Sequence, residues 1–466
     1  MKKGITIVFI ANMINMVISV FNSFFLPKYL SIETYGYYKV FQLYVGYLGI
    51  AHLGFVDGIY LKYGGINIKE INGKEVLKSS CTLRNMQFIL SLMIVVVSAV
   101  LKDPIVLFLA LTCIPINMIA FYKNFFLATG EFEKYGTTIS LIPLITFISN
   151  IFFMFVLKTD NYILYMAAYL FANVLIYLWL EFKSIKVFGD YKIFSFDFHI
   201  LKSNIAAGIS LTLGNFVSVL ITSIDRWCIQ MWMSISEFSF YSFAVSLENL
   251  FNVCVSAVTA TMYNYLCKTQ DDKKIIKLKS YCIIMGVYLV AVAFPAKFII
   301  KLWIPKYIGS LACMFILICA HSFYFVIKAV YVNLYKAKGQ QKHYFYQMIQ
   351  ILIIAAISNT VFYFLVSKTI EAIAFASLCT AVVWYFMCYY ELRSIRGNIK
   401  ETITLVVCAV YYLICGIYVE NPILGCCVYL FGITIIVVSL CKNEFLEIVD
   451  FGKDQIYSII NKLKKK

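Results

Sequence analysis

The sequence predicts an all-α polytopic membrane protein with about fourteen transmembrane helices. Three observations support this fold class. Of the 466 residues, 62% are hydrophobic, against about 45–50% in a soluble domain. Only 14% are charged, against about 25% in a soluble domain. The apolar residues also gather into consecutive runs of about 20 residues, which is the length that a helix needs to cross a bilayer.

The apolar runs follow one another from the N-terminus to near the C-terminus. The segments between them are short, and the longest, near Leu61–Cys81 and Lys183–Asn204, have only about twenty residues each. None is long enough for a separate extramembrane catalytic domain. The predicted spans are 5–26, 39–61, 84–101, 104–128, 137–157, 162–182, 205–231, 239–266, 281–302, 311–334, 346–366, 370–391, 402–419 and 423–441.

Basic residues are concentrated in alternate loops. With a cytoplasmic N-terminus, about 30 of the 40 Lys and Arg residues, among them Arg84 and Lys279, lie in cytoplasmic segments. This bias predicts that both termini are cytoplasmic and that the number of spans is even. The net charge of +16 then indicates contacts with anionic membrane lipids rather than with nucleic acid. The outer loops are assigned only Lys28, Lys39, Lys102, Lys158, Lys306 and Lys368.

Two further features concern the cysteines and the tail. The fifteen cysteines include no CxxC pair and no zinc-like spacing, so we expect neither disulfides nor a metal site. The tail, 443–466, spaces apolar residues among acids and lysines. Both an interfacial amphipathic helix and a solvated basic tail fit this pattern.

The two halves of the chain repeat each other. Tyr122-x-Asn124-x-x-x-Ala128-x-Gly130 at the end of span four matches Tyr331-x-Asn333-x-x-x-Ala337-x-Gly339 at the end of span ten. The segments that begin at Ser31 and Ser234 also correspond. Six spans per repeat give both halves the same topology, related by an axis along the membrane normal. Spans 13 and 14 lie outside the repeat.

The first repeat carries a resemblance to a known family. A resemblance to polysaccharide flippases of the Wzx type, in the multidrug/oligosaccharidyl-lipid/polysaccharide exporter superfamily, rests on three features. They are two motifs of the first repeat, given below, the two Asn-x-x-x-Ala-x-Gly segments, and Asp225-Arg226. Lipid II flippases are related, but the arginine pattern of their first span is missing, since this region offers Asn12, Asn15 and Asn22. The motifs are Phe25-Leu26-Pro27-Lys28-Tyr29-Leu30-Ser31-x-Glu33-x-Tyr35-Gly36 and His52-Leu53-Gly54-Phe55-x-Asp57-Gly58-x-Tyr60-Leu61-Lys62-Tyr63-Gly64-Gly65.

The resemblance implies an N-lobe over 1–204, a C-lobe over 205–401 and an appended part over 402–466, with the lobes in a V around a central cavity. It implies a flippase that moves undecaprenyl-diphosphate-linked oligosaccharides across the bacterial cytoplasmic (inner) membrane by alternating access, for capsule, O-antigen or exopolysaccharide synthesis. A polysaccharide polymerase and its chain-length machinery are the implied protein partners. No cofactor is implied, and coupling to H+ or Na+ stays open.

Charged residues inside spans are candidates for function because burying them in lipid is unfavourable. Cations suit the diphosphate. Two of the cations have an ordinary alternative: an Asp225–Arg226 contact or snorkelling to the interface for Arg226, and a positive-inside role for Lys62. The candidate diphosphate ligands are Arg226, Lys328, Lys62 and Lys297.

Acids and histidines inside spans are candidates for ion coupling or gating, with a hydrogen-bonded structural role as the alternative. Asparagine and tyrosine side chains of the first repeat could contact sugars, although helix packing is the better explanation for any one of them. The coupling candidates are Asp57, Glu248, Asp225, His321 and His52, and the sugar candidates are Asn12, Asn15, Tyr44 and Tyr47.

Two other functions compete with the flippase. An ion-coupled multidrug exporter shares the fold, but it would need an acidic cavity and usually has twelve spans. A membrane polymerase or acyltransferase would need a large outer loop or clustered catalytic acids, and neither is visible in the sequence. The sequence therefore favours a transporter over an enzyme.

Overall fold

The computed structural model describes residues 2–188, 195–269, 271–450 and 453. These residues form helices and contain no strand. Twelve of the helices are long and apolar enough to cross a membrane, and a bent pair can supply a thirteenth span. The remaining predicted span, 239–266, lies in α10 (Ile235–Lys268), where some side chains are outside the described set. The prediction of an all-α multi-pass membrane protein is confirmed.

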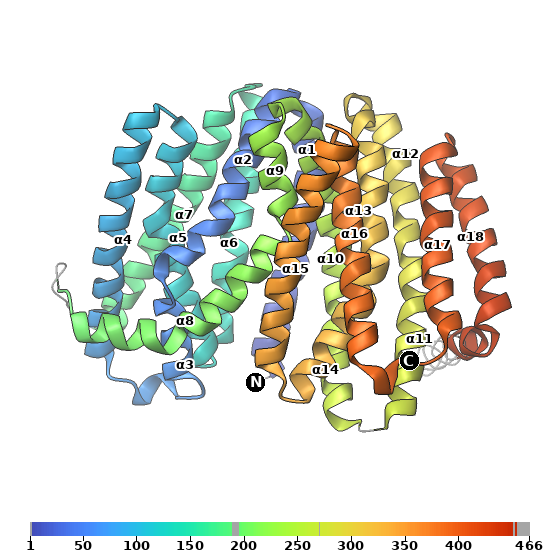
Figure 1. The fold of residues 1–466 in the computed structure, drawn as a ribbon. Coiled ribbons are helices and arrows are strands. Elements are labelled where there is room, and N and C mark those ends of the chain that lie inside the picture. The colour runs from blue at the N-terminus through green and yellow to red at the C-terminus, as the bar shows by residue number, and fades with distance from the viewer. Residues whose placement is uncertain (1, 189–194, 270, 451–452, 454–466) are drawn as a thin grey trace, which may run out of the picture. The chain divides into compact units, whose positions relative to one another are not determined.

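The chain divides into two compact units. The N unit comprises Met1–Arg226 and Met233–Ser239, and the C unit comprises Trp227–Trp232 and Phe240–Lys466. Figure 1 traces the helices of both in chain order. The further helices are α1 Lys2–Tyr29, α2 Ile32–Leu48, α3 Phe55–Tyr63, α4 Gly73–Leu101, α5 Pro104–Ala128, α6 Phe132–Ile151, α7 Tyr162–Phe188, α8 Phe198–Ile221, α9 Ile224–Trp232, α11 Asp272–Leu289, α12 Ala293–Trp303, α13 Leu311–Val326, α14 Val332–Ala337, α15 Gln341–Val361, α16 Ile370–Glu391, α17 Ile399–Tyr418 and α18 Pro422–Leu440.

The second span is bent rather than straight. Helices α2 and α3 meet at 59°, and Leu53 and Gly54 between them have φ angles of 51° and 94°. Gly54 and Gly58 lie against the backbone of α8, where a Cβ atom at either position would overlap Gly208 or Asn204. Small residues allow such close helix crossings in membranes. The close approach of α3 to α8 thus depends on glycine at both positions.

The seventh span is broken, although the sequence predicted one helix over 205–231. Helix α8 ends at Ile221 and α9 begins at Ile224. The hydroxyls of Thr222 and Ser223 donate to carbonyls one turn earlier, a contact that bends helices. Asp225 and Arg226 therefore lie at the start of a separate short helix.

The sequence repeat has a structural counterpart. Ser31 accepts a hydrogen bond from the Thr34 amide and caps α2, while Ser234 and Glu237 form a reciprocal capping box at the start of α10. Gly130 and Gly339 have φ angles of 74° and 69° just after the ends of α5 and α14. Glycine is the residue that adopts this left-handed geometry most readily. Corresponding positions of the two repeats thus lie at the beginnings and ends of corresponding helices.

The appended helices α17 and α18 are neighbours in the C unit (Figure 1). Lysines from α11 and α12 contact α17 and the connection between α17 and α18. Lys279 Nζ is 3.3 Å from Glu401 Oε2 on α17, and its side chain is fully buried. Lys301 Nζ donates to the carbonyl of Glu420, 2.7 Å away. Lys279 lies within α11 rather than between helices, while its place on the cytoplasmic side stays a prediction.

Part of the predicted amphipathic tail is described. Residues 442–450 are helical, and Glu447 pairs with Lys277 at 2.8 Å. The Phe445 and Tyr288 rings stack with centroids 6.2 Å apart. The rest of the tail, apart from residue 453, lies outside the described residues, so an interfacial role for it stays a prediction.

Candidate functional site

The predicted site residues divide between the two units, and each group is described within its own unit. The N unit holds the candidates from the first repeat and those at the start of α9. The C unit holds the candidates from α10, α12 and the α13 region. They are, respectively, Asn12, Asn15, Tyr44, Tyr47, His52, Asp57, Lys62, Asp225 and Arg226, and Glu248, Lys297, His321 and Lys328.

Lys62 borders a surface hollow of about 420 Å³ in the N unit. Asn204 lies in its wall, is only 3% exposed, and its Nδ2 has no hydrogen-bond partner among the described residues. Lys62 Nζ lies 2.6 Å from Glu75 Oε1, and both side chains are more than a third exposed. Exposed ion pairs are weak. Lys62 can therefore exchange this carboxylate for an incoming anion. The hollow is lined by Gly58, Leu61, Lys62, Ser203, Asn204 and Ala207.

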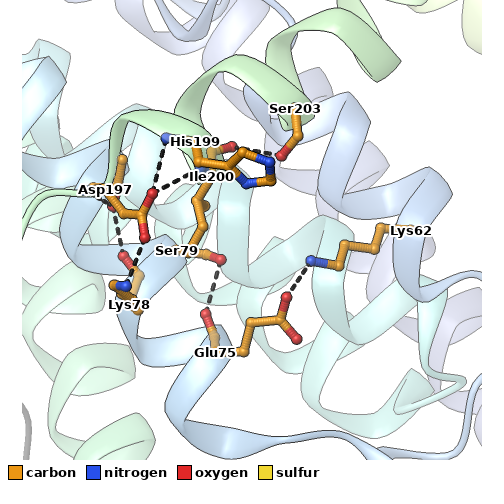
Figure 2. Close-up of polar contacts among 9 residues, drawn as sticks. Lys62, Glu75, Lys78, Ser79, Asp197, His199, Ile200 and Ser203 are labelled. Carbon is orange, nitrogen blue, oxygen red and sulfur yellow. Dashed lines mark hydrogen bonds and ion pairs between the residues drawn. The ribbon is translucent and has the colours of Figure 1, made fainter.

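Figure 2 shows a second carboxylate at the same end of the N unit, with a different role. Asp197 accepts from the amides of His199 and Ile200 at 2.8 and 3.0 Å, which caps α8. Its other oxygen lies 2.6 Å from Lys78 Nζ. The hydrogen bond from Lys78 and those from the backbone lower the pKa of Asp197 to about 2. Asp197 thus fixes the start of α8, while Glu75 faces Lys62.

Lys39 on α2 and Arg226 at the start of α9 are two cations of the N unit, and they are referred to below as the cationic cluster. Lys39 lies within α2, not in an outer loop as the sequence indicated. The charges of the two side chains act on each other. Arg226 donates to the Thr222 carbonyl at 3.2 Å, and its buried Nε has no hydrogen-bond partner among the described residues. An anion between these cations would relieve their repulsion and accept from this nitrogen.

Lys39 is the candidate that sequence reasoning missed. A signal for it exists: Ser31 is a typical N-cap residue, and a helix that begins after it includes position 39. The predicted second span, 39–61, begins at Lys39 itself and so leaves this residue at the boundary of the loop. Its Nζ lies 5.2 Å from the centroid of the Tyr35 ring one turn earlier.

The predicted sugar contacts are scattered over α1 and α2. Tyr47 is hydrogen-bonded to the Ser223 hydroxyl at the α8–α9 break, and Tyr44 is partly buried on α2. Asn15 donates to the Ile139 carbonyl at 3.2 Å, while Asn12 is exposed. Tyr47 is therefore held at the same break as Arg226. Sugar contact by these four residues stays a prediction.

Asp57 and His52 lie on either side of the bend in the second span. Asp57 is 9% exposed and accepts a hydrogen bond from the Thr212 hydroxyl on α8. His52 is 7% exposed, and its Nδ1 accepts from the Gly54 amide at 3.1 Å. Asp57 thus joins the bent span to α8, while the His52 bond lies within the bend itself. A role in ion coupling stays a prediction for both, as it does for Asp225, which accepts from the Arg226 amide at 2.7 Å.

In the C unit the structure brings three predicted residues close to one another. His321 Nε2 lies 2.8 Å from Glu248 Oε1, so α13 and α10 are joined by an acid–imidazole contact. Lys328 donates to Asn252 Oδ1 on α10 at 3.1 Å. Lys328 lies in a π-helical turn, Ile327–Tyr331, a distortion that is frequent at functional sites. Ion coupling by Glu248 and His321, and diphosphate binding by Lys328, stay predictions.

Lys297 has structural partners. Its Nζ donates to the carbonyls of Gly416 and Val419 at 2.7 and 2.8 Å, and the residue is 4% exposed. A cation at the C-terminus of α17 satisfies its last carbonyls and complements the helix dipole. Diphosphate binding by Lys297 stays a prediction.

Comparison with known proteins gives a fold. No family model and no curated protein matches the sequence. Among solved structures, the lipid II flippase MurJ in an inward closed conformation is similar with a TM-score of 0.64 and 14% identity, over 93% of this chain and 98% of that one. An inward-facing multidrug-resistance MATE transporter of the MOP superfamily is similar with a TM-score of 0.50 and 13% identity, over 83% and 95%. The chain thus has the fold found in both proteins.

Proposed function

We propose that the chain is a flippase that translocates undecaprenyl-diphosphate-linked oligosaccharides across the bacterial cytoplasmic membrane. The observation that supports this most directly is the cationic cluster of Lys39 and Arg226 inside the N unit. The fold, which resembles that of a lipid II flippase along nearly the whole chain, supports a transporter rather than an enzyme.

The cluster favours an anionic head group over a cationic drug. Two like charges in a weakly solvated environment repel each other, and each favours an anion nearby. A guanidinium binds phosphate oxygens with directed hydrogen bonds, and the buried Nε of Arg226 is an unused donor among the described residues. A diphosphate has enough oxygens to contact both side chains.

Lys62 is the proposed first contact on the cytoplasmic side. It lies at the end of α3 beside the hollow that Asn204 borders. A diphosphate that displaces Glu75 from Lys62 would also meet the amide of Asn204. The head group then moves to Lys39 and Arg226, while the polyprenyl tail stays in the lipid and the halves alternate in access.

The membrane potential supplies part of the driving force in this proposal. Moving one charge across 100 mV is worth about 2.3 kcal/mol, so a diphosphate with about two negative charges gains about 5 kcal/mol per 100 mV on export. The Glu248–His321 contact is a place where a proton could couple to the movement. On the outer side, a polysaccharide polymerase would consume the oligosaccharide for capsule, O-antigen or exopolysaccharide.

The test is head-group translocation in proteoliposomes with a fluorescent undecaprenyl-diphosphate oligosaccharide. We expect Lys39→Gln and Arg226→Gln each to lower the initial rate about tenfold or more, because each removes a charge-assisted contact worth about 1.5–3 kcal/mol. The matched control is Lys69→Gln, an exposed lysine of the same unit, which should keep the wild-type rate.

Folding is checked in parallel by thermal unfolding in detergent. Wild-type rates in both cluster variants would contradict the role of the cluster. Ion-driven efflux of a cationic dye, with no translocation of several different oligosaccharides, would instead identify a multidrug exporter.

A further inference from the structure

A second cavity lies in the N unit, and its lining residues differ from those of the hollow at Lys62. Its cavity of about 340 Å³ lies where the end of α5, the start of α6 and the end of α7 meet. That volume is within the usual range of ligand pockets. The lining residues are Ile68, Tyr122, Phe125, Phe126, Lys134, Trp179, Leu180, Lys183, Ser184, Lys186, Val187 and Phe188.

The walls of this cavity are aromatic and aliphatic. Phe125 is fully buried and Leu180 is 2% exposed, so the floor reaches the packed interior of the unit. The Phe125 and Phe188 rings are 6.1 Å apart, edge to face, and close one side. A pocket with such apolar walls suits an acyl chain better than it suits a sugar or an ion.

Three lysines surround the apolar floor. Lys183 and Lys186 on α7 are exposed, and Lys183 Nζ lies 3.9 Å from the Trp179 ring centroid, which holds its charge at the cavity. Lys134 on α6 also lines the cavity, and its Nζ lies 3.0 Å from Glu131 Oε2. Even with Glu131 counted, the charge around the opening is positive.

The location agrees with this chemistry. The ends of α5 and α7 and the start of α6 lie on the side that the basic loops predict to be cytoplasmic. That leaflet is rich in anionic lipids, and basic pockets between transmembrane helices bind their head groups.

We propose that this cavity binds one acidic phospholipid, such as phosphatidylglycerol, with its phosphate on Lys134, Lys183 and Lys186 and an acyl chain against Phe125 and Leu180. The cavity shares no lining residue with the hollow at Lys62, where the proposed diphosphate path begins. The lipid would brace the ends of three helices of the N unit.

The experiment measures lipid retention on the full chain by native mass spectrometry, with phosphatidylglycerol and phosphatidylcholine offered in equal amounts. The wild type should retain phosphatidylglycerol in preference. Each lysine contributes about fivefold near an anionic lipid, so the triple variant Lys134→Gln/Lys183→Gln/Lys186→Gln should lose most of the preference. The matched control, Lys268→Gln/Lys273→Gln/Lys274→Gln in the C unit, changes the net charge equally and should keep it.

Two further arms identify the occupant. Val187→Trp, at the cavity wall, should weaken retention of phosphatidylglycerol while all three lysines remain. Soluble glycerol phosphate should compete poorly because it has no acyl chain.

Equal retention in the triple variant and the wild type would overturn the proposal, as would an equal loss in the control. Efficient competition by glycerol phosphate would show a phosphate site without a lipid. Displacement of phosphatidylglycerol by undecaprenyl diphosphate at equal concentration would show a substrate site instead. None of these outcomes depends on translocation, so the flippase proposal is tested separately.

Discussion

In each unit, the third span of the repeat carries a basic residue of a buried ion pair. The two units differ in where the acidic partner of that pair lies. In the N unit, Arg84 on α4 lies 2.7 Å from Glu181 on α7, which also accepts from the Tyr122 hydroxyl. In the C unit, Lys279 on α11 pairs with Glu401 on α17, a helix outside the repeat. Tyr331, the repeat counterpart of Tyr122, packs against Tyr385, whose hydroxyl contacts Thr402 on α17.

This difference shows how a duplicated scaffold has diverged. In the N unit, both residues of the buried ion pair lie in the first six spans. In the C unit, the acidic partner comes from α17, one of the appended helices. Lysines of α11 and α12 are correspondingly engaged with α17 and the residues after it. The cationic cluster, with a guanidinium Nε that has no partner among the described residues, belongs to the N unit, and the proposed anion-binding role is therefore assigned to this unit.

The largest expected effect is that of Glu401→Ala. Lys279 is fully buried, and removing one partner of a buried pair typically costs about 3–5 kcal/mol. Thermal unfolding in detergent should show a marked loss of stability. Replacing both residues with leucine should recover much of the loss. Unchanged stability of the single variant would remove the basis for saying that the C unit depends on α17.

Glu181→Ala should be less damaging than Glu401→Ala. The Arg84 and Glu181 side chains are 15% and 11% exposed, against 0% and 7% in the other pair, so water can partly solvate the guanidinium. We expect a loss near the lower end, about 3 kcal/mol, in the same unfolding assay. A larger loss than for Glu401→Ala would reverse the comparison.

Lys297→Met tests whether this lysine stabilises the C-terminal end of α17 or binds substrate. Its amine donates to two carbonyls, so we expect a loss of about 1–3 kcal/mol with a nearly normal translocation rate for the protein that stays folded. Normal stability combined with lost translocation would contradict this structural role and support Lys297 as a ligand of the diphosphate.

The smallest effect concerns acid and the cap of α8. The pKa of Asp197 is lowered from its usual value of 3.8 to about 2. Its stabilising contribution is therefore complete above about pH 5 and is lost as the pH falls toward 2. The protection of the His199 and Ile200 amides against hydrogen exchange, measured relative to the intrinsic rate at each pH, should fall over that range in the wild type. In Asp197→Asn this pH-linked loss of protection should disappear, and its persistence would assign it to another group.

The fold was largely predictable because the length and polarity of the apolar runs determine where helices cross a membrane. The bend at Leu53–Gly54 and the break at Thr222–Ser223 were not predicted, because they depend on packing against α8 and on hydroxyl contacts within the helix. The partners of Lys279 and Lys297 lie more than a hundred residues away in sequence. A single sequence does not reveal such pairings, so buried lysines there resembled loop or substrate lysines.

The central claim is that Lys39 and Arg226 bind one diphosphate together. A double-mutant cycle on the affinity of the purified protein for undecaprenyl diphosphate tests this claim most directly, with Lys39→Gln, Arg226→Gln and the double variant. If both side chains contact the same anion, each single variant binds more weakly and the two effects are not additive, with a coupling energy of about 0.5–3 kcal/mol. Wild-type affinity in all three variants would contradict the account.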